Sequence, residues 1–315
     1  YEKEVYLKTT VTVNDEDYQL EGRADGVWTE NKTLTVEEIK TSARSWEECS
    51  QNTKDRYWAQ ARIYGHLLCQ QRHQDHAVIT LVYVQTSTDT VSRFTETKSA
   101  AELADDFTDL LDEFTAWLKL RSDIIKQRNA SIATLKFPFP QYRTGQHEFA
   151  AAVYKAIYSR ARLFVQAPTG TGKTISTLFP TIKAMGSGLI QRAFYLTAKQ
   201  STRRVAEQAI ALMADVGLRA KSITLTAKDT ITFADEPDDP SQNPYMLGYY
   251  DRLKPALHDL LEYEDQLTRS VIESYARKHT LDPFEFSLDA SLFCDVVICD
   301  YNYLFNPLVF LQRFF

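Results

Sequence analysis

A run of small residues near the middle of the chain carries the chemistry that is most easily recognised in the sequence. It comprises Ala167, Pro168, Thr169, Gly170, Thr171, Gly172, Lys173 and Thr174, between an apolar stretch, Leu163–Gln166, and a helical pattern. Glycines let the backbone curl so that its amides converge on phosphate oxygens, and the N-terminus of the following helix adds a partial positive charge. Lys173 would reach the β and γ phosphates, and Thr174 would bind Mg²⁺. The run predicts a nucleotide site; the alternative is a glycine-rich turn that matches by chance.

A second set of reactive residues lies near the N-terminus. Asp25 and Glu38 occupy neighbouring stretches of alternating apolar and polar residues, and Lys40 shares the face of Glu38 because strand side chains alternate. Burying these charges is costly unless something compensates them. A divalent metal between Asp25 and Glu38 would do so, while Lys40 stabilises the attacking hydroxide or the transition-state phosphate. Gln60 and Tyr64, four residues apart on a helix, could reach one strand of DNA.

The order of these N-terminal residues resembles the core of PD-(D/E)xK nucleases. Gln60 and Tyr64 resemble the QxxxY motif of RecB-like members of that superfamily, including the CRISPR-associated exonuclease group. The resemblance implies catalytic roles for all five residues, with Mg²⁺ or Mn²⁺ held by Asp25 and Glu38. The family's upstream His or Glu ligand would precede residue 1, and Glu4 is a poor substitute because it lies on a strand. The alternative is a salt-bridged hairpin with a chance Gln and Tyr pair.

The central glycine-rich run resembles motif I of superfamily 2 helicases, because Ala167 replaces the first glycine of the general phosphate-loop pattern. Gln146, at the end of Tyr142–Gln146, resembles the Q motif of those helicases. This implies that its amide recognises the edge of adenine, and hence ATP rather than GTP.

A further stretch, Phe194–Lys199 followed by Ser201–Arg204, resembles helicase motif Ia. The resemblance implies contacts with the phosphates of single-stranded DNA. The residues that would make them are Thr197, Lys199, Thr202 and Arg203. A solvated, basic helix start is the alternative interpretation.

The run Asp295–Pro307 makes the resemblance closest to XPD/DinG-like helicases, which implies 5′ to 3′ translocation. That branch usually carries four cysteines that hold an iron–sulfur cluster. The positions that we align with them are Thr232, Asp238, Asn243 and Asp282, so we expect no iron–sulfur cluster. Val296–Asp300 could instead be a Walker B strand. Because no DEAH box follows, we expect a fragment truncated inside the first motor domain, which hydrolyses ATP negligibly by itself.

The spacing of apolar residues predicts the elements that position these groups. Alternating runs at 5–13, 18–28 and 33–40 predict an antiparallel meander, followed by a helix at 54–71, a strand at 77–84 and a long helix at 100–128. Phe137–Pro140 cannot continue a helix, so we place the domain boundary at 130–140. From Leu163 onward, strands and helices alternate, which is typical of a parallel sheet.

We therefore predict an α/β chain in which a PD-(D/E)xK nuclease-like α+β domain (1–130) precedes part of a RecA-like P-loop motor domain. That domain would comprise 137–230 and 294–315, with a helical insertion at 231–293 in the place of the iron–sulfur domain.

Charge is distributed unevenly along the chain. The net charge is −6, yet residues 131–230 carry 14 Lys and Arg against 4 Asp and Glu, a local charge of +10. Such a block points to a polyanion partner. The four cysteines include no CxxC pair, which favours buried thiols and a reducing, cytoplasmic location. No long apolar run indicates a membrane span.

The sequence leaves three functions open. The leading hypothesis is an ATP-dependent DNA helicase fused to a metal-dependent nuclease that acts in DNA repair or replication, with ATP, Mg²⁺ and single-stranded DNA as its partners. The second is a restriction or phage-defence nuclease with an ATPase. The third is a non-catalytic DNA-binding module that guides a motor.

Overall fold

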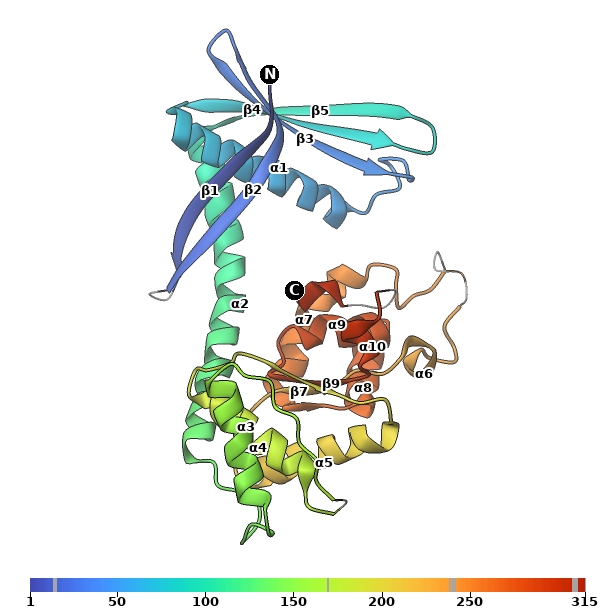
Figure 1. The fold of residues 1–315 in the computed structure, drawn as a ribbon. Coiled ribbons are helices and arrows are strands. Elements are labelled where there is room, and N and C mark those ends of the chain that lie inside the picture. Colours follow the sequence, from blue (N-terminus) through green and yellow to red (C-terminus); the bar gives the residue numbers. More distant parts are fainter. Residues whose placement is uncertain (14–15, 169, 238, 240–241, 308–310, 315) are drawn as a thin grey trace. The chain divides into compact units, whose positions relative to one another are not determined.

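The computed structural model describes residues 1–13, 16–168, 170–237, 239, 242–307 and 311–314, and of Glu16 and Gln200 it describes only the backbone. These residues form two compact units, Tyr1–Ser122 and Asp123–Phe315 (Figure 1). The division falls inside the long helix α2 (Ala100–Thr134), whereas the sequence placed the boundary at 130–140. Among the described residues, no helix has the length and apolar character needed to cross a membrane.

The first unit is built on a five-stranded sheet in the order β1-β2-β3-β4-β5. Its strands are β1 (Glu2–Val13), β2 (Glu16–Glu30), β3 (Thr33–Ser42), β4 (His76–Gln85) and β5 (Thr90–Ser99). The predicted antiparallel meander is confirmed, since β2 pairs antiparallel with both β1 and β3. β3 and β4 are parallel, and α1 (Gln51–Arg72) makes the crossover that parallel neighbours require. β5, which we did not predict, pairs antiparallel with β4.

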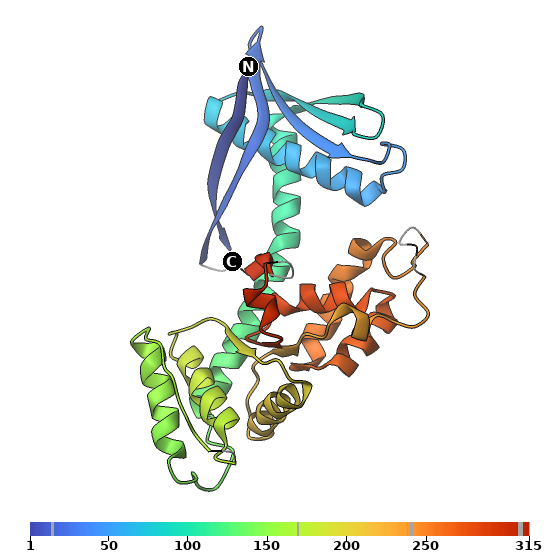
Figure 2. The ribbon, with the colours of Figure 1, turned by 45° about the vertical axis from the view of Figure 1, so that its right-hand side comes forward.

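Helix α1 lies across one face of this sheet, as Figures 1 and 2 both show. It begins where the Ser50 hydroxyl accepts a hydrogen bond from the Thr53 amide, and it ends at His73 in the left-handed conformation. Ala61, Leu67 and Leu68 form its buried side and pack into one apolar cluster with strand residues. The strand residues of that cluster include Leu7, Ala24, Leu34, Val36 and Ile79. This packing fixes the helix over the point where the polar residues of β2 and β3 lie.

The second unit contains a four-stranded sheet in the order β6-β9-β7-β8. Its strands are β6 (Ala193–Leu196), β7 (Ser222–Thr224), β8 (Gln266–Leu267) and β9 (Val296–Cys299). All of its pairings are parallel, which confirms the prediction for this part of the chain. The helices are α3 (Gln146–Tyr158), α4 (Lys173–Gly186), α5 (Gln200–Asp215), α6 (Lys228–Ile231), α7 (Tyr249–Tyr263), α8 (Arg269–His279), α9 (Pro283–Ser291) and α10 (Asn302–Phe305), followed by a 3-10 turn, Gln312–Phe314.

The last turns of α2 belong to the core of the second unit. Ile132 packs into an apolar cluster with residues of α4, α5 and β9. Four residues earlier, Arg128 donates to the buried Asp295 carboxylate at 2.5 Å, and the second oxygen of Asp295 accepts from the Lys221 amide at 2.9 Å. A buried charge needs such partners, so this network anchors α2 to the start of β9.

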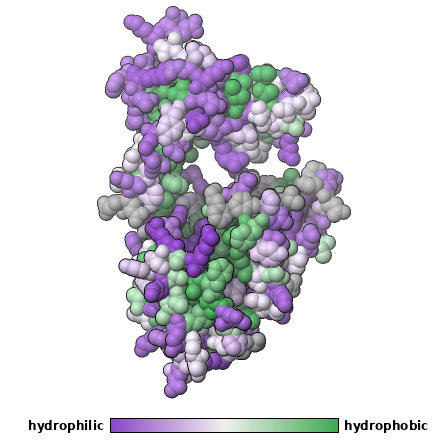
Figure 3. Space-filling view, in the orientation of Figure 1, coloured by the Kyte–Doolittle hydropathy of each residue, from purple (hydrophilic) through white to green (hydrophobic). Residues whose placement is uncertain are grey.

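The predicted strand Leu163–Gln166 is the main departure from expectation. Residues 161–168 belong to no strand or helix, and Phe164 is 92% exposed. A parallel strand has no hydrogen bonds of its own and depends on a neighbour for them. The described pairings give these residues none. Apolar surface is visible on this unit in Figure 3.

Candidate functional site

The predicted carboxylates lie where β2 and β3 stop pairing. The described register of these strands ends at Gly26 and Glu37, so Asp25 and Glu38 occupy the next positions. The Ile39 amide, which the ladder no longer uses, donates instead to Asp25 Oδ2 at 2.7 Å. The end of the ladder therefore opens space for two acidic side chains and holds one of them in place.

Glu38 is almost completely buried, with 2% of its surface exposed. Its Oε1 accepts from Lys40 Nζ at 2.6 Å, whereas its Oε2 is buried and has no hydrogen-bond partner. Burial raises the pKa of Glu38; the Lys40 ammonium opposes this shift, and the charge of Asp25 adds to it. A buried carboxylate oxygen without a partner is costly, and a cation relieves that cost.

The residues present therefore fit a divalent metal. Asp25 and Glu38 supply the hard oxygen donors that Mg²⁺ and Mn²⁺ prefer. Within the described part of the chain, no group of three or more His, Cys, Asp or Glu side chains is placed to hold an ion. These two carboxylates would be the protein side chains that hold it.

Lys40 is joined to the helix by hydrogen bonds. Its Nζ donates to Gln60 Oε1 at 2.8 Å, and Gln60 Nε2 donates to the Tyr64 hydroxyl at 3.0 Å. The Lys40 ammonium also lies 5.4 Å from the centre of the Tyr57 ring. The structure thus brings Glu38, Lys40, Gln60 and Tyr64 together, and their catalytic roles stay a prediction. Their mutual bonding was not predicted.

Glu37, beside Glu38 on β3, is a buried carboxylate that we did not single out. Its oxygens accept from the Tyr1 hydroxyl at 2.7 Å and from Arg93 at 2.6 Å. Strand alternation, which placed Glu38 and Lys40 on one face, was the available signal that Glu37 points to the other. Glu4 has a φ of 51° and a largely exposed side chain 3.5 Å from Arg23, so nothing places it as a metal ligand.

In the second unit, the predicted phosphate loop leads into α4. Gly170 and Gly172 have φ of 86° and 73°, a region that glycine enters without strain. Lys173 Nζ donates to the carbonyls of Ala167 and Pro168 at 3.0 and 2.7 Å. Thr174 Oγ1 lies 3.4 Å from the Tyr195 hydroxyl.

Other parts of the loop are held locally. The Thr171 hydroxyl donates to the Pro168 carbonyl at 2.9 Å, and the Arg143 guanidinium donates to the Gly170 carbonyl. Thr169 lies outside the described residues.

The predicted adenine reader, Gln146, is 4% exposed. Its Oε1 accepts from the Arg143 amide at 2.9 Å, and its Nε2 lies where a Cβ at Gly172 would come within 2.4 Å. In this arrangement the amide packs closely against Gly172 of the predicted phosphate loop. Its role toward adenine remains a prediction.

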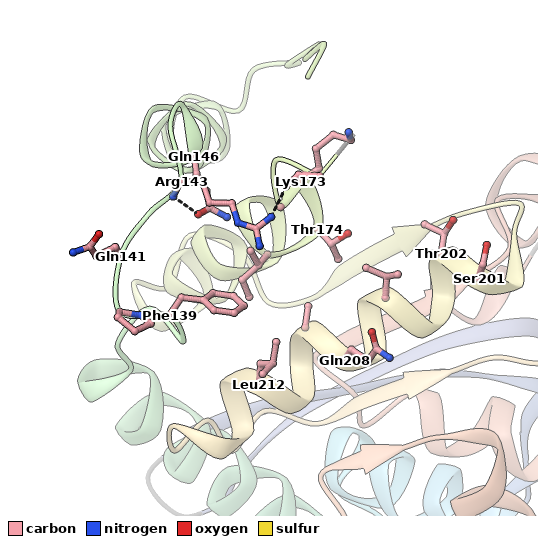
Figure 4. Close-up of a pocket in the computed structure, with 16 residues that line it drawn as sticks. Phe139, Gln141, Arg143, Gln146, Lys173, Thr174, Ser201, Thr202, Gln208 and Leu212 are labelled. Atoms are coloured by element: carbon pink, nitrogen blue, oxygen red, sulfur yellow. Dashed lines mark hydrogen bonds between the residues drawn. The ribbon is translucent and has the colours of Figure 1, made fainter. Parts of the chain in front are cut away.

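A cavity of about 890 Å³ adjoins the loop (Figure 4). It extends from Lys173 and Thr174 to Phe139 and the side of α5 that carries Gln208 and Leu212. The lining is mixed, since Arg143 and Thr174 are polar whereas Phe139, Val205 and Leu212 are apolar.

The residues expected to contact DNA phosphates surround the start of α5. Thr197 Oγ1 accepts from the Lys199 amide at 3.3 Å, and Lys199 is the residue before the helix. Thr202 lines the cavity. Arg203 points inward and pairs with Asp300 at 3.3 Å, and its Nε is buried without a hydrogen-bond partner.

The positions aligned with cluster cysteines have local roles. The Thr232 hydroxyl donates to the Lys228 carbonyl at 2.8 Å, Asn243 donates to Glu236 at 3.0 Å, and Asp282 accepts from the Glu285 amide at the start of α9 at 2.7 Å. Asp238 lies outside the described residues. All four cysteines of the chain are free thiols.

Comparison with known families decides the identity of the N-terminal part. Residues 2–144 match the sequence model of the PD-(D/E)XK nuclease superfamily. The N-terminal part of the chain is a PD-(D/E)XK nuclease superfamily domain. In this nuclease domain, Asp25, Glu38 and Lys40 have the order that the superfamily name describes, and their geometry is that given above.

Two further similarities are short or distant. A probable ATP-dependent helicase of Methanocaldococcus jannaschii is 40% identical over 47 residues, which are 15% of this chain and 7% of that protein. The crystal structure of SSO0001 is 24% identical, with a TM-score of 0.23, over 35% of this chain and 50% of that one. The chain thus spans only a small part of the helicase and half of the solved structure.

Proposed function

We propose that the nuclease domain cuts DNA with a divalent metal held by Asp25 and Glu38. The observation that carries this proposal is Glu38 Oε2, which is buried near Asp25 and has no hydrogen-bond partner. The other oxygen of the same carboxylate accepts from Lys40. A bound Mg²⁺ or Mn²⁺ would lower the pKa of a water and polarise the scissile phosphate.

Within this proposal, each residue has a distinct task. The Ile39 amide donates to the Asp25 carboxylate and so holds it in place. Glu38 is buried, which limits the access of water and strengthens the electrostatic interactions around it. The Lys40 ammonium, 2.6 Å from Glu38, supplies positive charge for the attacking hydroxide or the phosphate in the transition state. Cleavage needs both functions, so removal of either should abolish it.

The test is cleavage of labelled single-stranded DNA in Mg²⁺ or Mn²⁺. The wild type should cut, and Asp25→Ala and Lys40→Ala should not, although both should give the circular dichroism of the wild type. An uncut substrate with the wild type in both metals would favour the DNA-binding module. Cleavage by Asp25→Ala would show that another site does the chemistry.

We further propose that the second unit binds ATP and is part of an XPD/DinG-like DNA helicase acting in repair or replication. Supporting this are the two positive-φ glycines beside Lys173, the adjoining cavity and the short similarity to a probable ATP-dependent helicase. Saturable binding of a fluorescent ATP analogue, competed by ATP and lost in Lys173→Ala, tests the nucleotide site. A wild-type affinity in that variant would exclude the loop.

A further inference from the structure

The helix α1 presents two polar side chains to Lys40, and these bond to each other. Lys40 Nζ to Gln60 Oε1 is 2.8 Å, and Gln60 Nε2 to the Tyr64 hydroxyl is 3.0 Å. Both ends of the Gln60 amide are therefore engaged by protein groups. These two bonds leave one amide hydrogen and one oxygen lone pair of Gln60 unused.

Donor and acceptor chemistry fixes the direction of this chain of bonds. A lysine ammonium has three donors and no acceptor, so the oxygen of the Gln60 amide must face it. The NH₂ group of the amide then faces Tyr64, whose hydroxyl oxygen can accept. If the amide turned over, its NH₂ group would point at the ammonium and the bond to Lys40 would be lost. Lys40 thus selects the orientation of the amide, and the bond to the Tyr64 hydroxyl holds the Gln60 side chain in that place.

Tyr64 is itself fixed by a close approach of the backbone of β2. A Cβ at Gly22 would lie 2.7 Å from the Tyr64 hydroxyl and 2.8 Å from its ring. The ring is 9% exposed and packs in the cluster that contains Ala24 and Leu67. Only glycine at position 22 leaves room for the phenol where Gln60 can reach it.

We propose that Gln60 and Tyr64 are positioning residues for Lys40, and that the lack of a side chain at Gly22 leaves room for the Tyr64 phenol. The inference rests on the proposed nuclease function, in which Lys40 acts on the reacting phosphate. A lysine side chain is flexible and loses much conformational freedom when it is held. Gln60 and Glu38 hold the ammonium from two sides, so the ordering is done before DNA binds.

Cleavage kinetics of Tyr64→Phe, Gln60→Ala and the double variant test whether Tyr64 acts on Lys40 through Gln60. Tyr64→Phe should lower kcat about tenfold and Gln60→Ala roughly 10- to 100-fold, as expected for a lost hydrogen bond to a charged group. KM, and the Kd for DNA measured in Ca²⁺, should change less than about twofold. Because Tyr64 acts through Gln60, the double variant should be no slower than Gln60→Ala alone. Gln71→Ala, on the exposed end of the same helix, is the matched control and should match the wild type.

A second measurement does not depend on cleavage. The rate at which Lys40 is acylated by an acetyl ester can be followed by mass spectrometry, with exposed Lys32 as the internal standard. Gln60→Ala should raise the Lys40 rate about fivefold relative to Lys32, and Tyr64→Phe should raise it as well, because each frees the ammonium.

The outcomes separate the two proposals. Absence of cleavage by the wild type would overturn the nuclease proposal, while increased acylation of Lys40 would still support positioning by Gln60 and Tyr64. Multiplied losses in the double variant, an increased Kd for DNA with an unchanged kcat, or an unchanged acylation rate in both single variants would each overturn the positioning inference.

Discussion

Replacing Glu38 by glutamine should stabilise the metal-free nuclease domain while it removes a residue needed for function. Glu38 is 2% exposed, and one of its two oxygens has no hydrogen-bond partner. Among the described residues it pairs with Lys40, which keeps 19% of its side chain exposed and has a second partner in Gln60. Burying an ionised carboxylate in such a place lowers the free energy of unfolding of the domain.

The expected magnitude follows from three opposing effects. Removing the charge relieves a burial cost of several kcal/mol. The bond from Lys40 becomes one to a neutral amide, a loss of ~1 kcal/mol, and a buried polar group without a partner remains, at a cost of ~1–3 kcal/mol. We expect a net gain of about 1 kcal/mol, which for a domain of this size raises the unfolding temperature by about 4 °C.

The pH dependence has a definite sign. Burial raises the pKa of Glu38 in the folded state above its ordinary value of 4.5. The folded wild type is therefore favoured when Glu38 is protonated, and this contribution is lost as the pH rises through the raised pKa. The advantage of Glu38→Gln should be full above the raised pKa of Glu38 and should disappear as the pH falls toward 4.5.

Tryptophan fluorescence can follow this domain within the intact chain, because all four tryptophans, at positions 28, 46, 58 and 117, lie in Tyr1–Ser122. Samples should contain EDTA. The matched control is Glu37→Gln: Glu37 is also buried, but both of its oxygens are bonded. That variant should lose about 1 kcal/mol, since its Arg93 partner is largely exposed. Destabilisation by Glu38→Gln at pH 7 would refute the reasoning and show that the Lys40 pair outweighs the burial cost.

Three further predictions concern the second unit. Lys173→Ala should abolish ATP-dependent unwinding by the full-length protein, in a helicase assay, and leave the circular dichroism unchanged, because the described bonds of the Lys173 ammonium go to loop carbonyls. Asp295→Asn should cost about 3–5 kcal/mol in urea unfolding, since it leaves the Arg128 charge buried without its partner; a loss below about 1 kcal/mol would contradict this. Anaerobically purified protein should contain no stoichiometric iron or sulfide, because the aligned positions carry no thiolate; if both co-purify, the alignment is wrong.

Local sequence patterns were sufficient to predict most of the nuclease domain. Alternation placed β1, β2 and β3, and it also put Glu38 and Lys40 on one face. A four-residue spacing put Gln60 and Tyr64 on one side of α1. These are properties of short segments, for which backbone periodicity is enough.

Other features depend on partners that are distant in the sequence. That Gln60 bonds to Lys40 rather than projecting freely depends on how α1 packs on the sheet. The same holds for Gln146, which the sequence marks as a base reader and which the structure buries against Gly172. Arg203 similarly looks like a surface cation in the sequence but pairs with Asp300, 97 residues away.

The predicted strand Leu163–Gln166 shows the limit of apolar patterns. Its residues have high strand propensity, yet propensity in a sheet reflects packing against neighbours. With no paired neighbour among the described residues, the segment forms no strand and Phe164 stays exposed.

The response of the nuclease domain to Mn²⁺ tests the central claim most directly. A metal that binds only the folded domain adds about 2.7 kcal/mol at ~100 times its Kd, which a thermal unfolding curve resolves. We predict a clear rise in unfolding temperature for the wild type and for Lys40→Ala, and a much smaller one for Asp25→Asn and Glu38→Gln. Lys40→Ala should keep the metal response and lose DNA cleavage in the same samples. Equal responses in all four proteins, or none in the wild type, would contradict a metal site at Asp25 and Glu38.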